Sequence, residues 1–137
     1  MTSEANKALV RRYYGEVMDG GRLELLPELV APGFRNHGPS GQVGGPEGLA
    51  RLIGGFRAAL PDLRVTVEQI VAEGDLVSTR WRARGTHRGT LLGIPATGKA
   101  LEVTATVVDR IADGRIVERW ANQDDLGLLR QLGLVPS

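Results

Sequence analysis

The spacing of apolar residues changes at Pro61, and this change constrains the fold more than any other feature of the sequence. In the first 60 residues the apolar side chains recur every three to four positions, as on one face of a helix. Beyond Pro61 they alternate with polar residues, as in a strand that buries one face. Helices followed by long strands indicate an α+β domain rather than an alternating α/β one.

Three helices are expected in the first part of the chain. They cover Glu4 to Met18, Leu23 to Val30, and a segment that Pro46 opens and Pro61 ends. Proline is tolerated in the first turn of a helix and stops it elsewhere. The stretch from 31 to 45 is rich in glycine and proline, so we expect a loop there, with at most a brief strand at 34–36.

Four long strands and a short closing helix are expected after Pro61. The alternating segments are Leu63–Val71, Val77–Ala83, Leu101–Val107 and Ile116–Asn122, and the helix covers Leu126 to Leu132. Turn signals separate the first strand pair and the last, at residues 73–75 and at 113–114. Because only one face of each strand is apolar, we expect a curved antiparallel sheet wrapped around the three helices, forming a cone with a mouth.

The composition indicates one domain over residues 1–137 and argues against several kinds of partner. The 17 basic and 16 acidic residues nearly cancel and form no run, so neither nucleic acid nor a membrane surface is expected. No apolar run approaches the roughly 20 residues of a membrane span. The absence of cysteine removes disulfides, thiol catalysis and zinc–thiolate sites. The polar N-terminus shows no signal peptide, so a cytoplasmic protein is expected.

The end of the last strand combines apolar and polar residues on one face. With a period of two, that face holds Ile116, Glu118, Trp120, Asn122 and Asp124. A face that starts apolar and ends in Asn and Asp suits the wall of a pocket whose deep end binds polar groups. His87 ends a similar strand and is expected to converge on Asp124. A histidine and an aspartate in an apolar cleft are enough for proton transfer on a carbonyl compound.

Short motifs spread over most of the chain carry a family resemblance. They are Asn36-His37-Gly38-Pro39, Leu60-Pro61-Asp62-Leu63, Ala72-Glu73-Gly74-Asp75, Gly85-Thr86-His87-Arg88-Gly89, Pro95-Ala96-Thr97-Gly98-Lys99, and Glu118-Arg119-Trp120 through Asp124 to Gln131-Leu132-Gly133. In this order they resemble the SnoaL-like polyketide cyclases, also called predicted ester cyclases, of the NTF2-like superfamily. The resemblance implies the cone fold, a homodimer, and intramolecular aldol closure of a small apolar carbonyl substrate without metal or cofactor.

The resemblance also implies roles for particular residues. The family's acid–base carboxylate follows the strand tryptophan and precedes a Leu-Gly-Leu-Leu helix, which is the place of Asp124. Asp125 is the adjacent rival, and alternation points it away from the pocket. Related ketosteroid isomerases carry a catalytic base just before the proline of the first motif. Gly38 stands there in this chain, which weakens an isomerase function, and Ala96 replaces a second proline that many members have.

We therefore expect Asp124 to act as the general acid–base, with its pKa raised by burial among apolar walls. His87 is expected to hydrogen-bond the substrate carbonyl or to orient Asp124. Four further residues are expected to bind the substrate, two through polar contacts and two as apolar walls: His37, Asn122, Trp120 and Trp81. The outer face of the sheet, which would carry Thr104, Thr106, Val108, Val117 and Ala121, is expected to form the dimer contact.

Each assignment has a structural alternative. Asp124 directly precedes a helix and could be its N-cap, and His87 could stabilise a turn. The tryptophans could belong to the core, His37 to the rim, and Asn122 to a bulge.

Other functions of the fold remain open from sequence. The chain could be a non-catalytic binding or dimerisation module, because fold does not determine function. Water attack on an epoxide would need a second carboxylate and an arginine facing Asp124. Asp109 with Arg80 or Arg82 are the candidates, although alternation sends both arginines to the face opposite Trp81. Two histidines are too few to suggest a metal site, although His37, His87 and Asp124 could in principle form one.

Overall fold

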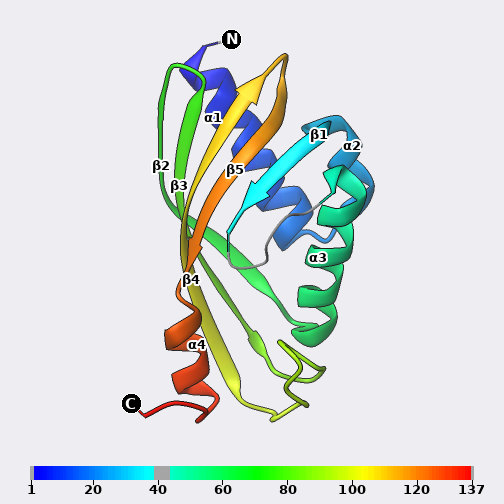
Figure 1. The fold of residues 1–137 in the computed structure, drawn as a ribbon, viewed down its shortest axis with the longest axis vertical. Coiled ribbons are helices and arrows are strands. Elements are labelled where there is room, and N and C mark those ends of the chain that lie inside the picture. The colour runs from blue at the N-terminus through cyan, green and yellow to red at the C-terminus, as the bar shows by residue number, and fades with distance from the viewer. Residues whose placement is uncertain (1, 39–43, 137) are drawn as a thin grey trace.

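A computed structural model describes residues 2–38 and 44–136 and shows a mixed α+β fold (Figure 1). Its elements are α1 (Ser3–Arg12), the π-helical η1 (Tyr13–Asp19), the 3-10 helix η2 (Leu23–Leu25), α2 (Leu26–Leu29), β1 (Val30–His37), α3 (Gly45–Ala59), β2 (Arg64–Glu73), β3 (Leu76–Thr86), β4 (Ala100–Ala112), β5 (Arg115–Gln123) and α4 (Asp125–Gln131). The expected order of helices and long strands is therefore present. No helix in the described ranges is long and apolar enough to cross a membrane.

The five strands form one sheet in the order β1-β5-β4-β3-β2. Strands β2 to β5 are antiparallel neighbours, as expected from their alternation, whereas β1 runs parallel to β5. Of the loop expected over 31–45, residues 31–37 belong instead to β1, so the brief strand expected at 34–36 is present but longer, and residues 39–43 lie outside the described residues. Glycine and proline are tolerated here because β1 is an edge strand.

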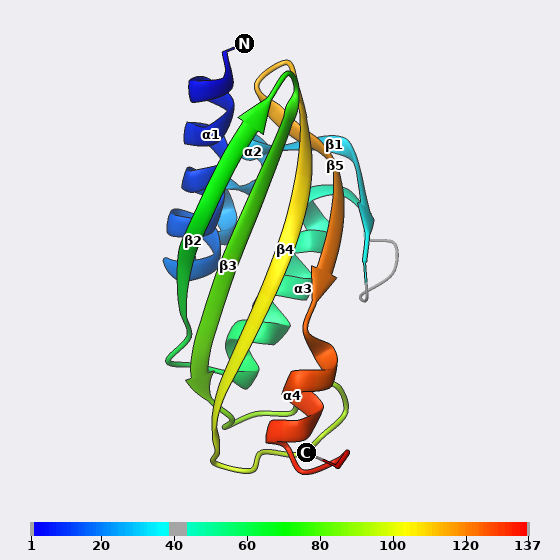
Figure 2. The same cartoon turned by 90° about the vertical axis from the view of Figure 1, so that its left-hand side faces the viewer.

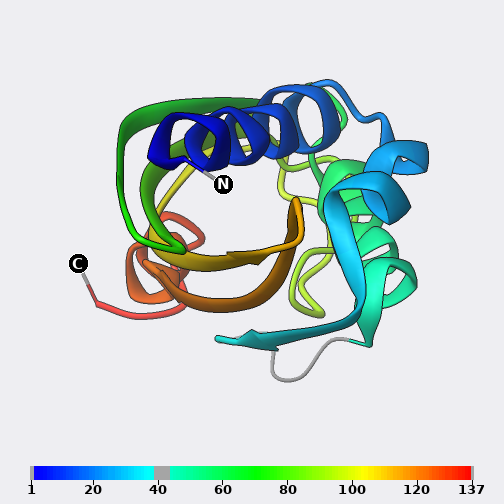
Figure 3. The ribbon, with the colours of Figure 1, turned by 90° about the horizontal axis from the view of Figure 1, so that it is seen from above.

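The curved sheet forms a trough that the helices cover on one side (Figures 2 and 3). Helix α1 and its continuation η1 pack against β2, and α3 packs against β1. The core lies between these layers and includes the buried side chains of Val10, Leu49 and Ile116. In the wider turn of η1 two consecutive residues, Tyr13 and Tyr14, are both buried. Such π-helical turns occur frequently at functional sites.

A β-bulge in β5 decides which of its side chains face the helices. Arg110 of β4 pairs with Glu118 whereas Ile111 pairs with Ile116, so Val117 is an extra residue on β5. The expected face that joins Ile116 to Trp120 is therefore wrong, because alternation was counted straight through the bulge. Ile116 faces inward, and beyond the bulge the inward residues are Arg119, Ala121 and Gln123, while Glu118, Trp120 and Asn122 lie on the outer face.

Candidate active site

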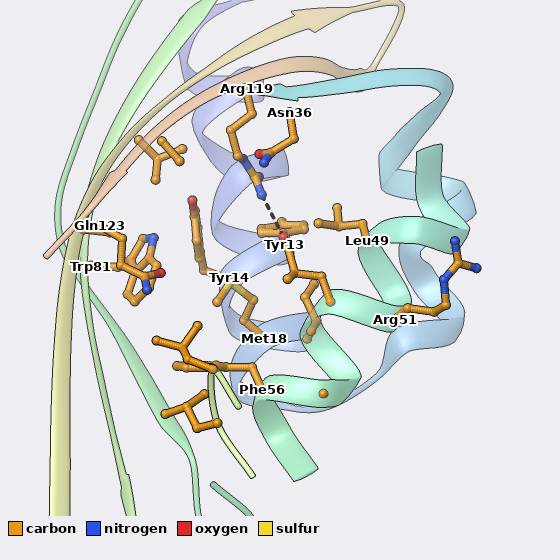
Figure 4. A pocket seen from close by; sticks show the side chains of 18 of the residues that line it. Tyr13, Tyr14, Met18, Asn36, Leu49, Arg51, Phe56, Trp81, Arg119 and Gln123 are labelled. Carbon is orange, nitrogen blue, oxygen red and sulfur yellow. Dashed lines mark hydrogen bonds between the residues drawn. The ribbon is translucent and has the colours of Figure 1, made fainter. Parts of the chain in front are cut away.

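A cavity of about 390 Å³ lies between the concave face of the sheet and the helices η1 and α3 (Figure 4). Most of its wall is apolar. Representative wall residues from both layers are Met18, Leu49, Phe56, Trp81, Ala105 and Val107. Cavities of this size and composition accommodate a small apolar ligand and use a few polar groups to orient it.

One end of the cavity carries a buried network of charged and polar side chains. Arg119 donates from Nε to Asp109 Oδ1 at 2.7 Å and from Nη2 to Oδ2 at 3.4 Å. Its Nη1 donates to the Tyr13 hydroxyl at 2.8 Å, and its guanidinium carbon lies 4.3 Å from the centre of the Tyr13 ring (Figure 4). The three side chains come from β4, β5 and η1, so the network joins the sheet to the helix layer.

Burial shifts the pKa of each member of this network. It raises the pKa of the Asp109 carboxyl, and the neighbouring Arg119 offsets only part of that effect. Burial lowers the pKa of Arg119, but Asp109 and the tyrosines outweigh it and raise that pKa well above its usual value. Burial also raises the pKa of Tyr13, against the opposing influence of Arg119. At neutral pH the arginine is thus charged and Tyr13 is a protonated phenol.

Further polar side chains line the cavity, among them Asn36, Gln123 and Tyr14. Asn36 pairs with Arg119 across the β1–β5 ladder and lies beside it at the same end (Figure 4). Gln123 is held by its Nε2, which donates to Asp125 Oδ1 at 2.8 Å. The Tyr14 hydroxyl is buried and makes no hydrogen bond of normal geometry in the described chain. Burial raises the pKa of Tyr14 well above its usual value, and the nearby Arg119 charge offsets only part of that effect.

The described part of the cavity wall contains hydrogen-bond donors but no obvious base. Among the described residues that line it there is no aspartate, glutamate or histidine. Its ionisable groups are two buried tyrosines, the buried Arg119 and Arg51, which is exposed on α3. The arrangement can therefore stabilise a negatively charged oxygen more readily than it can remove a proton.

The structure contradicts the predicted placement of Asp124. This residue is exposed and caps α4, where its Oδ1 accepts a hydrogen bond from the Gly127 amide at 2.8 Å. It does not line the cavity, and no hydrogen bond or ion pair in the described chain joins it to His87. The physical reason is again the bulge, which turns the face of Trp120 and Asn122 outward before the strand reaches Asp124.

His87 is fully buried, but it does not line the cavity. It instead makes hydrogen bonds that hold the loop between β3 and β4. Its Nδ1 lies 2.9 Å from the Thr97 hydroxyl and accepts from the Thr97 amide at 3.3 Å. Its main chain exchanges hydrogen bonds with Lys99 and Gly98. Nδ1 therefore acts as an acceptor, and Nε2 has no partner among the described residues. These hydrogen bonds join the two ends of the loop that contributes Leu91 to the cavity wall.

Of the four residues expected to bind substrate, only Trp81 lines the cavity. His37 and Trp120 stack on the outer face with ring centres 5.6 Å apart. His37 Nε2 lies 2.7 Å from Glu118 Oε2, and this hydrogen bond is the main reason that the pKa of Glu118 is lowered. Asn122 is exposed on the same face. The bulge in β5 places Trp120 and Asn122 on the opposite side of the sheet from the cavity, and His37 of β1 pairs with Trp120 there.

The arrangement required for epoxide hydrolysis is not found in the described chain. Asp109 is paired with Arg119 and does not face Asp124, while Arg80 and Arg82 pair with Glu68 on the outer side. Within residues 2–38 and 44–136, no three carboxylate or imidazole side chains lie close enough together to bind a metal ion. The functional candidates that sequence reasoning missed are Tyr13, Asn36, Arg119 and Gln123.

Comparison with known proteins identifies the relatives of this chain. The family model of the SnoaL-like polyketide cyclases matches residues 8–132. An aklanonic acid methyl ester cyclase of Streptomyces peucetius, DnrD, is 33% identical over 91% of this chain and 88% of its own length. The nogalonic acid methyl ester cyclase of Streptomyces nogalater is 31% identical over 82% of this chain and 87% of its own.

Solved structures agree with this relationship. IdmH from Streptomyces antibioticus superimposes with a TM-score of 0.81 at 37% identity, covering 93% of this chain and 98% of that one. TsrD from Streptomyces laurentii superimposes with a TM-score of 0.89 at 29% identity, covering 98% and 99%. The fold is thus that of the NTF2-like cyclases, and the relatives support a cyclase-like role.

The buried pair predicts strong coupling between two substitutions. Asp109→Leu alone leaves the Arg119 charge buried without its partner and should lower the free energy of unfolding by about 3–5 kcal/mol. Combining it with Arg119→Met removes both charges and should cost far less than the sum of the single changes. Urea unfolding of the two single variants and the double variant measures this coupling. Strictly additive losses would show that the two side chains do not depend on each other.

Proposed function

Because the chain belongs to the SnoaL-like polyketide cyclase family, we propose that it closes a ring in an apolar, polyketide-like carbonyl compound by a cofactor-free aldol-type reaction. The observation that carries this proposal is the cavity, which is apolar along most of its length and polar at one end. Such a cavity can fold a flexible substrate so that the two reacting carbons meet. Holding reactants in this way supplies a large part of the rate enhancement in an intramolecular reaction.

The polar end supports the same chemistry. In an aldol closure the attacked carbonyl oxygen gains negative charge as the carbon–carbon bond forms. Fixed donors aimed at that oxygen stabilise the transition state. Tyr13 and Arg119 lie, with Asn36, at the polar end of a cavity whose wall is mostly apolar, and the low polarity of that wall strengthens their effect.

A second function, binding without turnover, is favoured by one specific observation. The described cavity wall has no carboxylate or imidazole, and Asp124 is occupied as a helix cap. A protein that only binds an apolar carbonyl compound needs neither group. The two proposals differ in whether the bound compound is converted.

The relatives' names provide substrates for a direct test of turnover. Purified protein is incubated with aklanonic acid methyl ester or nogalonic acid methyl ester, and the product is followed by chromatography and mass spectrometry. An aldol addition within one molecule yields a product of unchanged mass, so we expect a new chromatographic peak at the mass of the substrate. Saturable binding of either ester with no new peak would favour the binding function instead.

A matched pair of variants locates the reaction in the molecule. Ala121→Phe places a ring in the cavity and should abolish turnover while the protein remains folded by circular dichroism. Asp124→Asn retains a residue that caps helices well and should leave turnover within about twofold of the unchanged protein. If Asp124→Asn loses activity while Ala121→Phe keeps it, Asp124 is the acid–base group and the cavity is not the active site.

We further propose that two copies pair through the outer face of the sheet. That face presents Trp120, 37% exposed, with Arg110 over its ring at 5.6 Å and Val108 opposite it in the ladder. Tryptophan is enriched at the centres of protein–protein interfaces relative to the rest of the surface. Light scattering at micromolar concentration should give the mass of a dimer, and Trp120→Asp should shift it toward the monomer. A monomer mass for the unchanged protein would contradict the pairing.

A further inference from the structure

We infer that Tyr13 is the catalytic hydrogen-bond donor of the cavity and that Arg119 and Asp109 position it. The role of Tyr13 in ring closure rests on the proposed cyclase function. Its ability to bind an enolate oxygen rests only on the geometry of the polar end.

The hydrogen bond from Arg119 determines what the Tyr13 hydroxyl can do. The oxygen accepts from Arg119 Nη1 at 2.8 Å, so this lone pair is occupied by a cationic donor. Among the described residues no acceptor is found for the hydroxyl proton, and Tyr13 lines the cavity. A hydroxyl that accepts a bond from a cation becomes a stronger donor, because linked hydrogen bonds polarise one another. The proton is thus available to a substrate oxygen.

The charges around the cavity favour an anionic oxygen at this place. Asp109 occupies two donors of the Arg119 guanidinium and is itself fully buried away from the cavity wall. The guanidinium turns its remaining edge toward Tyr13 and lines the cavity. Arg51, the other charged residue among the described lining residues, is exposed on α3 and points away from the Arg119 end of the cavity (Figure 4). Arg119 and the Tyr13 hydroxyl are therefore the groups that stabilise a developing negative charge there.

The absence of a base on the described wall restricts the substrate. Burial raises the pKa of both tyrosines, so they remain protonated donors at neutral pH. A proton beside a single carbonyl group is too weakly acidic to leave without a base. A carbon between two carbonyl groups holds a far more acidic proton, and such compounds exist partly as the enol. A 1,3-dicarbonyl therefore brings to the cavity the nucleophile that the wall cannot generate.

The ring closure then balances without any co-reactant. The enol carbon forms a bond to the carbon of a second carbonyl group, and the π bond of that carbonyl breaks. The enol oxygen becomes a carbonyl oxygen and releases its proton, while the attacked oxygen becomes a hydroxyl and gains one. Tyr13 can donate its proton to the new alkoxide and recover one from the enol. One proton moves within the substrate, and the protein ends unchanged.

A spectroscopic probe tests the oxyanion site independently of turnover. Benzoylacetone, a 1,3-diketone, absorbs differently as the enol and as the enolate, so absorbance measured against pH gives the pKa of the bound probe. We expect the unchanged protein to lower the probe's pKa by about one unit or more relative to solution. Tyr13→Phe should abolish most of this shift, because it removes the donor and little else.

Tyr14→Phe separates the two buried tyrosine donors. Tyr14 lies next to Tyr13 on the same helix and lines the same cavity, but Arg119 makes no hydrogen bond to its hydroxyl. This variant should lose a clearly smaller part of the shift than Tyr13→Phe does. Since Arg119→Met alone threatens folding, the double variant with Asp109→Leu is used to remove the charge, and it should abolish the shift. Circular dichroism confirms that each variant is folded.

The outcomes separate this inference from the proposed function. An unshifted pKa, a probe that does not bind at millimolar concentration, or a shift lost in Tyr14→Phe but kept in Tyr13→Phe would overturn the inference. Turnover of the relatives' esters without any probe shift would overturn the inference and leave the cyclase function standing. A probe shift that depends on Tyr13, without turnover of either ester, would support the site and count against the cyclase function.

Discussion

The buried ion pair between Asp109 and Arg119 determines how the sheet and the helices fit together. Two charges removed from water are costly unless each meets its partner with good geometry. This requirement fixes the register of β4 against β5, because Asp109 must face Arg119. The bond from Arg119 to Tyr13 then fixes η1 over the sheet. A slip of one residue would break both contacts.

The bulge in β5 follows from the same constraint. The Asp113-Gly114 turn pairs Ala112 with Arg115, and an unbroken ladder from there would set Asp109 opposite Glu118. Like charges facing each other across a ladder are destabilising. The extra residue, Val117, moves Arg119 opposite Asp109 and Glu118 opposite Arg110, so that both pairs become complementary. This register also determines which residues of β5 beyond the bulge line the cavity, namely Arg119, Ala121 and Gln123.

Much of the fold could be predicted from sequence, because period-two alternation is a property of each strand taken alone. The antiparallel strands from β2 to β5 and the inward position of Trp81 came from that pattern. Only a brief strand at 34–36 was expected within β1, and its full length could not be found in the same way. Its glycine and proline residues obscure the alternation, and its pairing with β5 depends on tertiary contacts.

The site was predicted less well, because one inserted residue, Val117, changes which side chains of β5 face the cavity. Alternation counted from Ile116 placed Trp120, Asn122 and Asp124 inside, whereas the bulge places them outside or at the helix cap. The charge pattern around the turn contained a usable signal, since only a bulged register matches Asp109 to Arg119. Burial of Tyr13 beside Tyr14 depends on the π-helical turn, which the spacing of apolar residues does not reveal.

We propose that substrate chemistry takes place at the Tyr13–Arg119 end of the cavity. A crystal structure of the protein with a bound 1,3-diketone is the sharpest test. One diketone oxygen should lie within hydrogen-bond distance of the Tyr13 hydroxyl, with the apolar remainder against Trp81. A diketone bound instead on the outer face beside Trp120 and His37, or at the Asp124 carboxylate, would contradict it.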